Sequence, residues 1–219
     1  MGSTPRPTID EIEEAWQRDE QHASFTGPRK RAKVSHPEQV DVDILGYFLA
    51  GILQHARNGE TCLAVKELAM DPEPYKSAEE LETYCQSYVQ LRSLLAPELL
   101  PSCTTVLCRN LVNAGSHNAF GIRAGGEDAE EYMGYGIWPV ASYFNHSCAP
   151  NVAKKRIGNG WVFRAAGEIA VGDECCITYL GGDEKDLDVR ERRARLSEVW
   201  GFTCQCCRCV DEVAGSKSA

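Results

Sequence analysis

The sequence lacks a long hydrophobic run, a secretory signal and an excess of basic charge. The longest apolar-leaning stretch, residues 44–53, is too short to cross a bilayer. Residues 1–19 are polar and acidic, without the apolar segment of a signal peptide. Lysine and arginine total 23 against 32 aspartate and glutamate residues, which argues against a primary role in gripping nucleic-acid phosphates. We therefore expect a soluble intracellular protein, in nucleus or cytoplasm, with no membrane or direct nucleic-acid partner.

Cysteine, by contrast, is abundant. There are eleven, and in a reducing compartment they indicate free thiols or metal ligands rather than disulfides. Cys204, Cys206 and Cys209 form a Cys-x-Cys-x-x-Cys pattern that places three thiolates within reach of one ion. Structural Zn²⁺ takes four such ligands, so a fourth must come from elsewhere. The adjacent Cys207 is a poor choice, although it could substitute, and a tail of unligated thiols is the alternative.

The first half has the pattern of helices. From 42 to 57 apolar residues recur at three- and four-residue spacing. A second helix is expected from Ser77, a cap with Glu80 three residues on, until Pro97 intervenes; Cys85 in its apolar stripe should be a small buried hydrophobe. Residues 1–40 are expected to be poorly ordered or to hold a short helix around Ile12, Ala15 and Trp16. Their basic cluster, 29–33, is a nuclear-import signal or solvated linker charge.

The second half has the pattern of short strands. Five glycines after residue 120 predict turns between strands: Gly121, Gly125, Gly126, Gly134 and Gly136. Residues 152–157 and 161–165 flank Gly158-Asn159-Gly160, where Asn-Gly suits a tight hairpin turn. A further turn at Gly172-Asp173 precedes an apolar segment. A helix is predicted over 188–200, with charge pairs Asp188–Arg192 and Glu191–Arg195 and with Leu196, Val199 and Trp200 available for burial.

A polar cluster, Asn145-His146-Ser147-Cys148-Ala149-Pro150-Asn151, is by itself as typical of a capped turn as of a binding site. It is followed in order by Gly167-Glu168-Ile169, Gly172-Asp173-Glu174, Ile177-Thr178-Tyr179 and the cysteine pattern. This order resembles the C-terminal part of SET domains, and more narrowly the SMYD-like (SET and MYND) branch, over residues 117–209. The resemblance implies a pseudoknot and makes Cys148 the fourth zinc ligand, with Cys204, Cys206 and Cys209.

The resemblance also implies a cofactor, S-adenosylmethionine, and roles for particular residues. Asn145 and His146 would bind the cofactor, Phe202 would pack on its adenine side, and Asn118 would contact it from upstream. Tyr179 would be the catalytic tyrosine and part of the cofactor site. A phenol between the cofactor and a lysine channel can orient the amine for in-line methyl transfer. An isolated tyrosine in Ile-Thr-Tyr is otherwise typical of a strand core.

The sequence departs from this family in three places. Trp200 stands where a tyrosine commonly lines the lysine channel, so a hydroxyl is lost while a wall that favours cations is kept. The Gly-x-Gly strand pair that begins SET domains is not found, and the MYND cysteines are missing, although Trp16 and His22 resemble a remnant of that module. We therefore expect a truncated or unusual minimal member.

These observations predict an α+β fold with a helical N-terminal half, a β-rich SET (β-clip) core and a small post-SET zinc site. The expected boundaries are 1–40 for the N-terminal segment, 41–116 for a helical insert, 117–182 for the SET core, 183–210 for the helix and zinc tail, and 211–219 for a disordered tail. The predicted function is S-adenosylmethionine-dependent protein-lysine methylation by a monomer acting on a basic, lysine-containing segment of a histone or other protein. The alternative is a catalytically inactive, zinc-stabilised interaction module.

Overall fold

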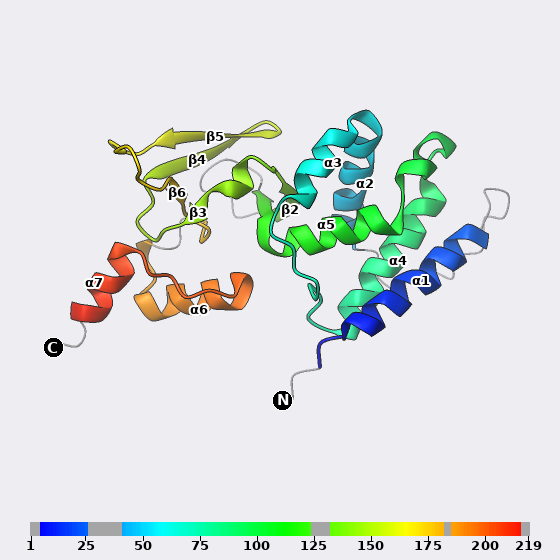
Figure 1. Ribbon diagram of the computed structural model, residues 1–219, viewed down its shortest axis with the longest axis horizontal. Helices are drawn as coiled ribbons and strands as arrows, with labels where there is room; N and C mark the ends of the chain where they lie inside the picture. Colours follow the sequence, from blue (N-terminus) through cyan, green and yellow to red (C-terminus); the bar gives the residue numbers. More distant parts are fainter. Residues whose placement is uncertain (1–4, 26–40, 124–131, 182–184, 216–219) are drawn as a thin grey trace. The chain divides into compact units, whose positions relative to one another are not determined.

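The computed structural model describes residues 5–25, 41–123, 132–181 and 185–215 (Figure 1). Two compact units divide the described chain. The first contains the described residues up to 123 together with 132–139, and the second contains those from 140 onward. The basic cluster at 29–33, Gly125 and Gly126 lie outside the described residues. None of the described helices is long and apolar enough to span a membrane.

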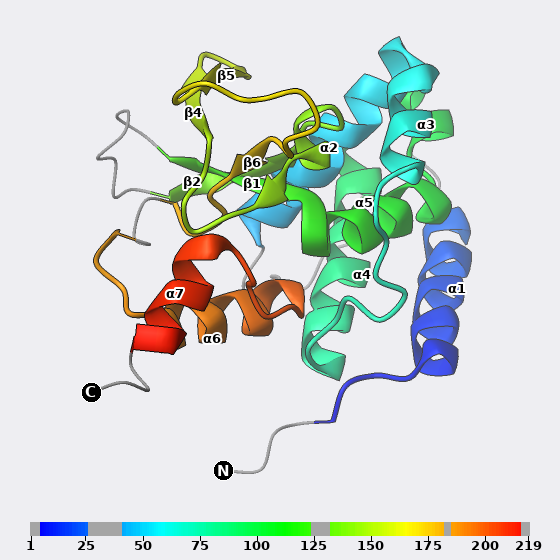
Figure 2. The ribbon, with the colours of Figure 1, turned by 60° about the vertical axis from the view of Figure 1, so that its left-hand side comes forward.

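The first unit is mainly helical. Its elements are α1 (Ile9–Phe25), α2 (Val42–Arg57), α3 (Gly59–Lys66), α4 (Ala78–Leu94), the 3-10 helix η1 (Pro97–Ser102), α5 (Thr105–Asn118), β1 (Ala119–Arg123) and β2 (Tyr132–Ile137). Helices α1 and α4 run side by side in both views (Figures 1 and 2), although more than 50 residues separate them in sequence. The predicted helix around Ile12, Ala15 and Trp16 is present, and it is 17 residues long.

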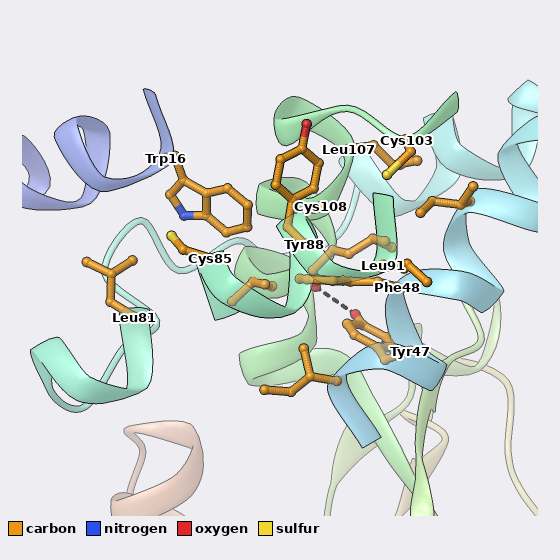
Figure 3. Packing of buried hydrophobic residues seen from close by; sticks show 14 of the residues in the cluster. Trp16, Tyr47, Phe48, Leu81, Cys85, Tyr88, Leu91, Cys103, Leu107 and Cys108 are labelled. Atoms are coloured by element: carbon orange, nitrogen blue, oxygen red, sulfur yellow. Dashed lines mark hydrogen bonds between the residues drawn. The ribbon is translucent and has the colours of Figure 1, made fainter. Parts of the chain in front are cut away.

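The core of this unit is apolar and aromatic (Figure 3). Trp16 of α1, Phe48 of α2 and Tyr88 of α4 are each at most 2% exposed. The one polar atom of the Trp16 ring is satisfied, because Nε1 donates to the Tyr75 hydroxyl at 2.9 Å. Cys85 is fully buried among them, as predicted, and serves as a small hydrophobe.

Local sequence signals explain the two central helices. Helix α2 has the predicted bounds, and Asp41 caps it by accepting hydrogen bonds from the backbone N–H groups of Asp43 and Ile44. Helix α4 begins after Ser77, whose hydroxyl accepts from the Glu80 N–H, as the capping pattern predicted. The sequence did not single out Tyr47, which is buried and donates to the Leu111 carbonyl at 2.6 Å.

Three of the five glycines after residue 120 were wrongly assigned to turns. Gly121 lies within β1, while Gly134 and Gly136 lie within β2, which pairs antiparallel with β1. Gly134 has a φ of +126° where the register shifts opposite Ile122 and Arg123, so glycine permits a β-bulge there. At Gly136 a Cβ would come within 3.2 Å of the Trp138 ring, so this glycine allows close packing.

The second unit consists of short strands and two helices. Its elements are the 3-10 helix η2 (Ala141–Tyr143), β3 (Asn145–His146), β4 (Val152–Ile157), β5 (Gly160–Ala165), β6 (Cys176–Ile177), α6 (Val189–Trp200) and α7 (Cys207–Gly215). Strand β3 pairs parallel with β6, which places Asn145 opposite Cys176 and His146 opposite Ile177. This pairing brings the Asn-His-Ser-Cys segment beside the Ile-Thr-Tyr segment; the pseudoknot stays a prediction.

The predicted β4–β5 hairpin is present, but its turn differs in detail. Ile157 pairs with Gly160, so the two turn residues are Gly158 and Asn159 rather than Asn159 and Gly160. Gly158 supplies the positive φ, at +59°. The turn before β6 is also present, with Gly172 at a φ of +97°.

The last third of the chain requires three corrections. Asp188 does not pair with Arg192 but caps α6 in a reciprocal capping box with Glu191. Val199 is 48% exposed, whereas Leu196 is fully buried. Residues 211–215, expected to be disordered, belong to α7, because Glu212 forms ion pairs that hold this helix.

Candidate functional site

Four cysteine side chains converge in the second unit. The sulfur atoms of Cys148, Cys204, Cys206 and Cys209 all lie within 4.8 Å of one another. Cys148 follows β3, Cys204 and Cys206 lie between α6 and α7, and Cys209 is in the first turn of α7. Gly201 ends α6 in the left-handed conformation, with a φ of +74°, and so turns the chain back toward Cys148.

The spacing of these sulfur atoms fits a tetrahedral metal site. The Sγ of Cys148 lies 3.8 Å from that of Cys204 and 3.5 Å from that of Cys209. A tetrahedron with Zn–S bonds of about 2.3 Å separates its sulfur atoms by about 3.8 Å. Cys207, the other possible fourth ligand, is exposed and outside the cluster. The structure thus brings together the four cysteines expected to be ligands.

The thiols of the cluster differ in acidity. Burial raises the pKa of Cys148 and of Cys204. Burial also acts to raise the pKa of Cys206, but hydrogen bonds from the backbone of Cys209 and Cys148 and from neighbouring thiols bring it to about 6. The lowered pKa of Cys206 favours the thiolate, which is the form that binds a metal.

The second feature is a group of aromatic rings around Tyr179. Its ring centroid lies 5.2 Å from that of His146, 5.1 Å from Trp200 and 6.4 Å from Phe202. The Tyr179 hydroxyl donates to the Phe144 carbonyl at 2.7 Å. Burial, followed by the nearby Cys176 and Glu174, raises the pKa of Tyr179, so its phenol keeps its proton at neutral pH.

His146 lies between the two features. Its Nδ1 accepts the Tyr179 backbone N–H at 3.0 Å, and its Nε2 lies 3.2 Å from the Cys148 sulfur. Because Nδ1 accepts, the neutral ring carries its proton on Nε2 and donates it toward sulfur. The imidazole thus connects the cysteine cluster to the backbone of Tyr179.

Two residues to which the sequence analysis assigned no role, Glu174 and Asn151, fix the segment that contains Asn145. The Nδ2 of Asn145 donates to Glu174 Oε1 at 2.5 Å. Asn151 braces the same segment: its Oδ1 accepts the Cys176 N–H at 2.8 Å and its Nδ2 donates to the Glu174 carbonyl at 2.9 Å. Both residues stand in the motifs of the resemblance, so their position there was the available signal.

Asn118 belongs to the first unit. It ends α5, is 8% exposed, and donates from Nδ2 to the carbonyls of Ala69 and Ala114, each at 2.8 Å. Its contact with a cofactor stays a prediction.

A match to a protein-family model agrees with the SET-like motifs between residues 145 and 179. The SET domain model matches residues 17–180, about three quarters of the chain. The chain therefore belongs to the SET-domain family. The match begins well before residue 117, where the quoted motifs begin, and the boundaries of the helical insert stay a prediction.

Similar proteins carry the names of protein lysine methyltransferases. The potential protein lysine methyltransferase SET6 of Saccharomyces cerevisiae is 41% identical over 122 residues, which are 55% of this chain and 32% of that protein. The histone-lysine N-methyltransferase ASHR2 of Arabidopsis thaliana is 30% identical over 58% of this chain and 34% of its own length. Human SMYD3, a histone-lysine N-methyltransferase, is 38% identical over 35% and 17%. The chain thus spans about a third or less of these relatives.

Proposed function

We propose that this chain supports S-adenosylmethionine-dependent methylation of protein lysines, with Tyr179 as the catalytic residue. The observation that carries the proposal is the enclosure of the Tyr179 phenol by the rings of His146, Trp200 and Phe202 in a SET-domain chain. Lysine methyltransferases among its relatives support a protein substrate.

The residues around Tyr179 suit a methyl transfer to an amine. S-adenosylmethionine would supply an electrophilic methyl group on a sulfonium. The Tyr179 hydroxyl commits its proton to the Phe144 carbonyl, so its oxygen lone pairs remain able to face a cation or a polarised methyl group. Asn145, His146 and Phe202 would hold the cofactor beside it. Trp200 would wall the lysine channel, because an indole face attracts an ammonium group.

We further propose that the four clustered cysteines bind one structural Zn²⁺. Four soft donors at tetrahedral spacing leave no position for a substrate, which is typical of a structural rather than a catalytic site. The bound metal would fix Cys148 against α7 and, through His146, the backbone of Tyr179.

The substrate class we propose is a basic, lysine-containing segment of a histone or another protein, bound by a monomer. The net charge of −9 favours such a partner over an acidic one. This part of the proposal is tested by methylation of basic and charge-reversed peptides of the same length.

The direct test compares Tyr179→Phe with unchanged zinc-loaded protein, using a labelled methyl donor and a panel of histones. We expect Tyr179→Phe to lose at least about tenfold in transfer rate, in line with the loss of one electrostatic group. Tyr143→Phe is the matched control, because Tyr143 is 68% exposed in the same unit. Equal transfer by both variants would remove Tyr179 from the mechanism.

A non-catalytic interaction module is the second candidate. No strand occurs before Ala119 in the part of the chain that the structure describes, so a Gly-x-Gly strand pair is not seen there. Calorimetry with S-adenosylmethionine separates the two functions. Micromolar binding supports the enzyme, whereas the absence of binding to folded, zinc-loaded protein supports the module.

A further inference from the structure

Arg192 is a charged side chain with no access to solvent. It lies on α6, and its relative exposure is 0%. Transferring a guanidinium from water to a protein interior costs several kcal/mol unless opposite charge and hydrogen bonds compensate it. The sequence pattern predicted Asp188 as the partner of Arg192, but that carboxylate caps the helix instead. Another source of negative charge must therefore stabilise Arg192.

The guanidinium reaches the cysteine cluster. Its Nη2 donates to the Cys209 sulfur at 3.6 Å and to Glu212 at 2.7 Å, while Nη1 donates to the Leu187 carbonyl at 2.6 Å. Its Nε has no hydrogen-bond partner among the described residues. The Nη2 atom of the guanidinium therefore faces both the Glu212 carboxylate and the sulfur of Cys209, a proposed zinc ligand.

The positive charge of Arg192 can offset the negative charge of a zinc ion bound by four thiolates. Four thiolates around one divalent zinc carry a net charge of −2, which is itself unfavourable in a buried site. Glu212 does not neutralise Arg192 alone, because it also accepts from Arg208 Nε at 2.7 Å. Two guanidinium groups thus share one carboxylate, and the remaining positive charge lies beside the cluster.

The same contacts hold helix α7. Cys209 and Glu212 lie on one face of α7, three residues apart, and both meet Arg192 of α6. Arg208 adds a bond from Nη1 to the Cys148 carbonyl at 3.3 Å. Arg192 therefore contacts both a sulfur of the cysteine cluster and the carboxylate that joins α7 to α6.

We propose that Arg192 is a positioning residue of the metal centre, which neutralises and orients the Cys209 thiolate and locks α7 through Glu212. This inference rests on the proposed zinc site. Groups that hydrogen-bond to metal ligands typically contribute about 10- to 100-fold to metal affinity. Arg192→Met keeps much of the side-chain length but removes the charge and the donors.

The test measures zinc affinity of the full chain by chelator competition for Arg192→Met, Arg192→Lys, Glu212→Gln and Arg195→Met. Arg195→Met is the matched control, since it makes the same change at an exposed position of α6. We expect Arg192→Met to weaken zinc binding about 10- to 100-fold. Arg192→Lys should recover part of this loss, Glu212→Gln should weaken binding less than Arg192→Met, and Arg195→Met should have no effect.

A spectroscopic measurement separates this role from general packing. With Co²⁺ in place of zinc, removal of a donor from the Cys209 sulfur should shift the sulfur-to-metal charge-transfer band to lower energy in Arg192→Met, and to a lesser extent in Arg192→Lys. If Arg192→Met does not fold, the shift of the charge-transfer band is measured on Arg192→Lys instead. Equal affinity and an unmoved band relative to Arg195→Met would overturn the role of Arg192. If the protein without substitutions binds no zinc, both the proposed metal site and the role of Arg192 are overturned.

Discussion

The two units of this protein bury cysteine for different reasons. In the first unit Cys85, Cys103 and Cys108 are fully buried within a large core that contains Trp16 and Phe48. In the second unit the buried cluster is small, and three of its five members are cysteines: Cys148, Leu180, Leu196, Cys204 and Cys209. Cysteine is a small hydrophobe where apolar volume surrounds it and a ligand donor where other thiols converge on it.

This difference has an energetic consequence. A small unit with few apolar residues cannot offset its conformational entropy by burial alone, and it commonly needs a metal or disulfides. Among the described residues, the apolar core of the first unit is much larger than that of the second. We therefore expect the first unit to be stabilised by packing and the second by the proposed zinc.

The largest effect should come from the cysteine cluster. Cys209→Ser removes one of the four proposed zinc ligands. The apparent binding free energy of a structural zinc, about 10–16 kcal/mol, exceeds the loss of folding free energy that a small unit can tolerate. We expect loss of bound zinc and of tertiary structure in residues 140–215, with the first unit still folded. Metal analysis and amide exchange measure both. Cys207→Ser, at an exposed neighbour outside the cluster, is the control, and an equal effect there would contradict the ligand assignment.

Breaking the apolar core should have the complementary effect. Trp16→Ala removes a side chain that is 1% exposed, together with its bond to Tyr75, and should cost about 3–5 kcal/mol in the free energy of unfolding of the first unit. Denaturant unfolding gives the change in stability. Zinc stoichiometry should stay the same, and its loss would show that the two units are not stabilised independently.

Several features of the first unit were predictable from local sequence patterns. The bounds of α2, the Ser77 cap and the burial of Cys85 follow from apolar spacing and capping chemistry. The glycines of β1 and β2 were misread, because glycine is equally typical of turns and of bulges where rings pack closely. Which of the two applies depends on cross-strand partners far away in sequence.

An intermediate effect is expected at the connection between the cysteine cluster and Tyr179. His146→Phe keeps an aromatic ring but removes the Nδ1 acceptor of the Tyr179 N–H, which should cost about 1–2 kcal/mol in the stability of the second unit. Thermal unfolding of zinc-loaded protein measures this cost. His55→Phe, at an exposed position of α2, should change it little. Equal stability of both variants would show that the imidazole contributes only its ring.

The candidate site was only partly predictable as well. The spacing of Cys204, Cys206 and Cys209 indicated three ligands and left the fourth open, because nothing local specifies a residue more than 50 positions upstream. The roles of Arg192 and Asn151 depend on tertiary contacts with α7 and β6. Helical spacing assigned Arg192 to the wrong carboxylate, because Asp188 serves as a cap.

The smallest effect should come from a half-exposed ion pair in the first unit. Both Arg109 terminal nitrogens donate to the Glu13 carboxylate, and this bond lowers the pKa of Glu13. A lowered folded pKa means that the pair stabilises the unit above the ordinary glutamate range and that this contribution is lost as the pH falls through the folded pKa. Because Glu13 is 44% exposed, solvent screening limits the effect to well under about 1 kcal/mol. Comparing Glu13→Gln with unchanged protein from pH 7 to 3 measures it; a growing difference at low pH would contradict the sign.

The most direct test of the account is amide hydrogen exchange of the full chain with zinc bound and after chelation. Metal removal should abolish protection of the Tyr179 amide, which donates to His146, and of α7. Amides of α2 and α4 should remain protected, because an apolar core stabilises those helices. Unchanged protection of Tyr179 and α7 after complete chelation would contradict the claim that a metal on four cysteines stabilises the second unit.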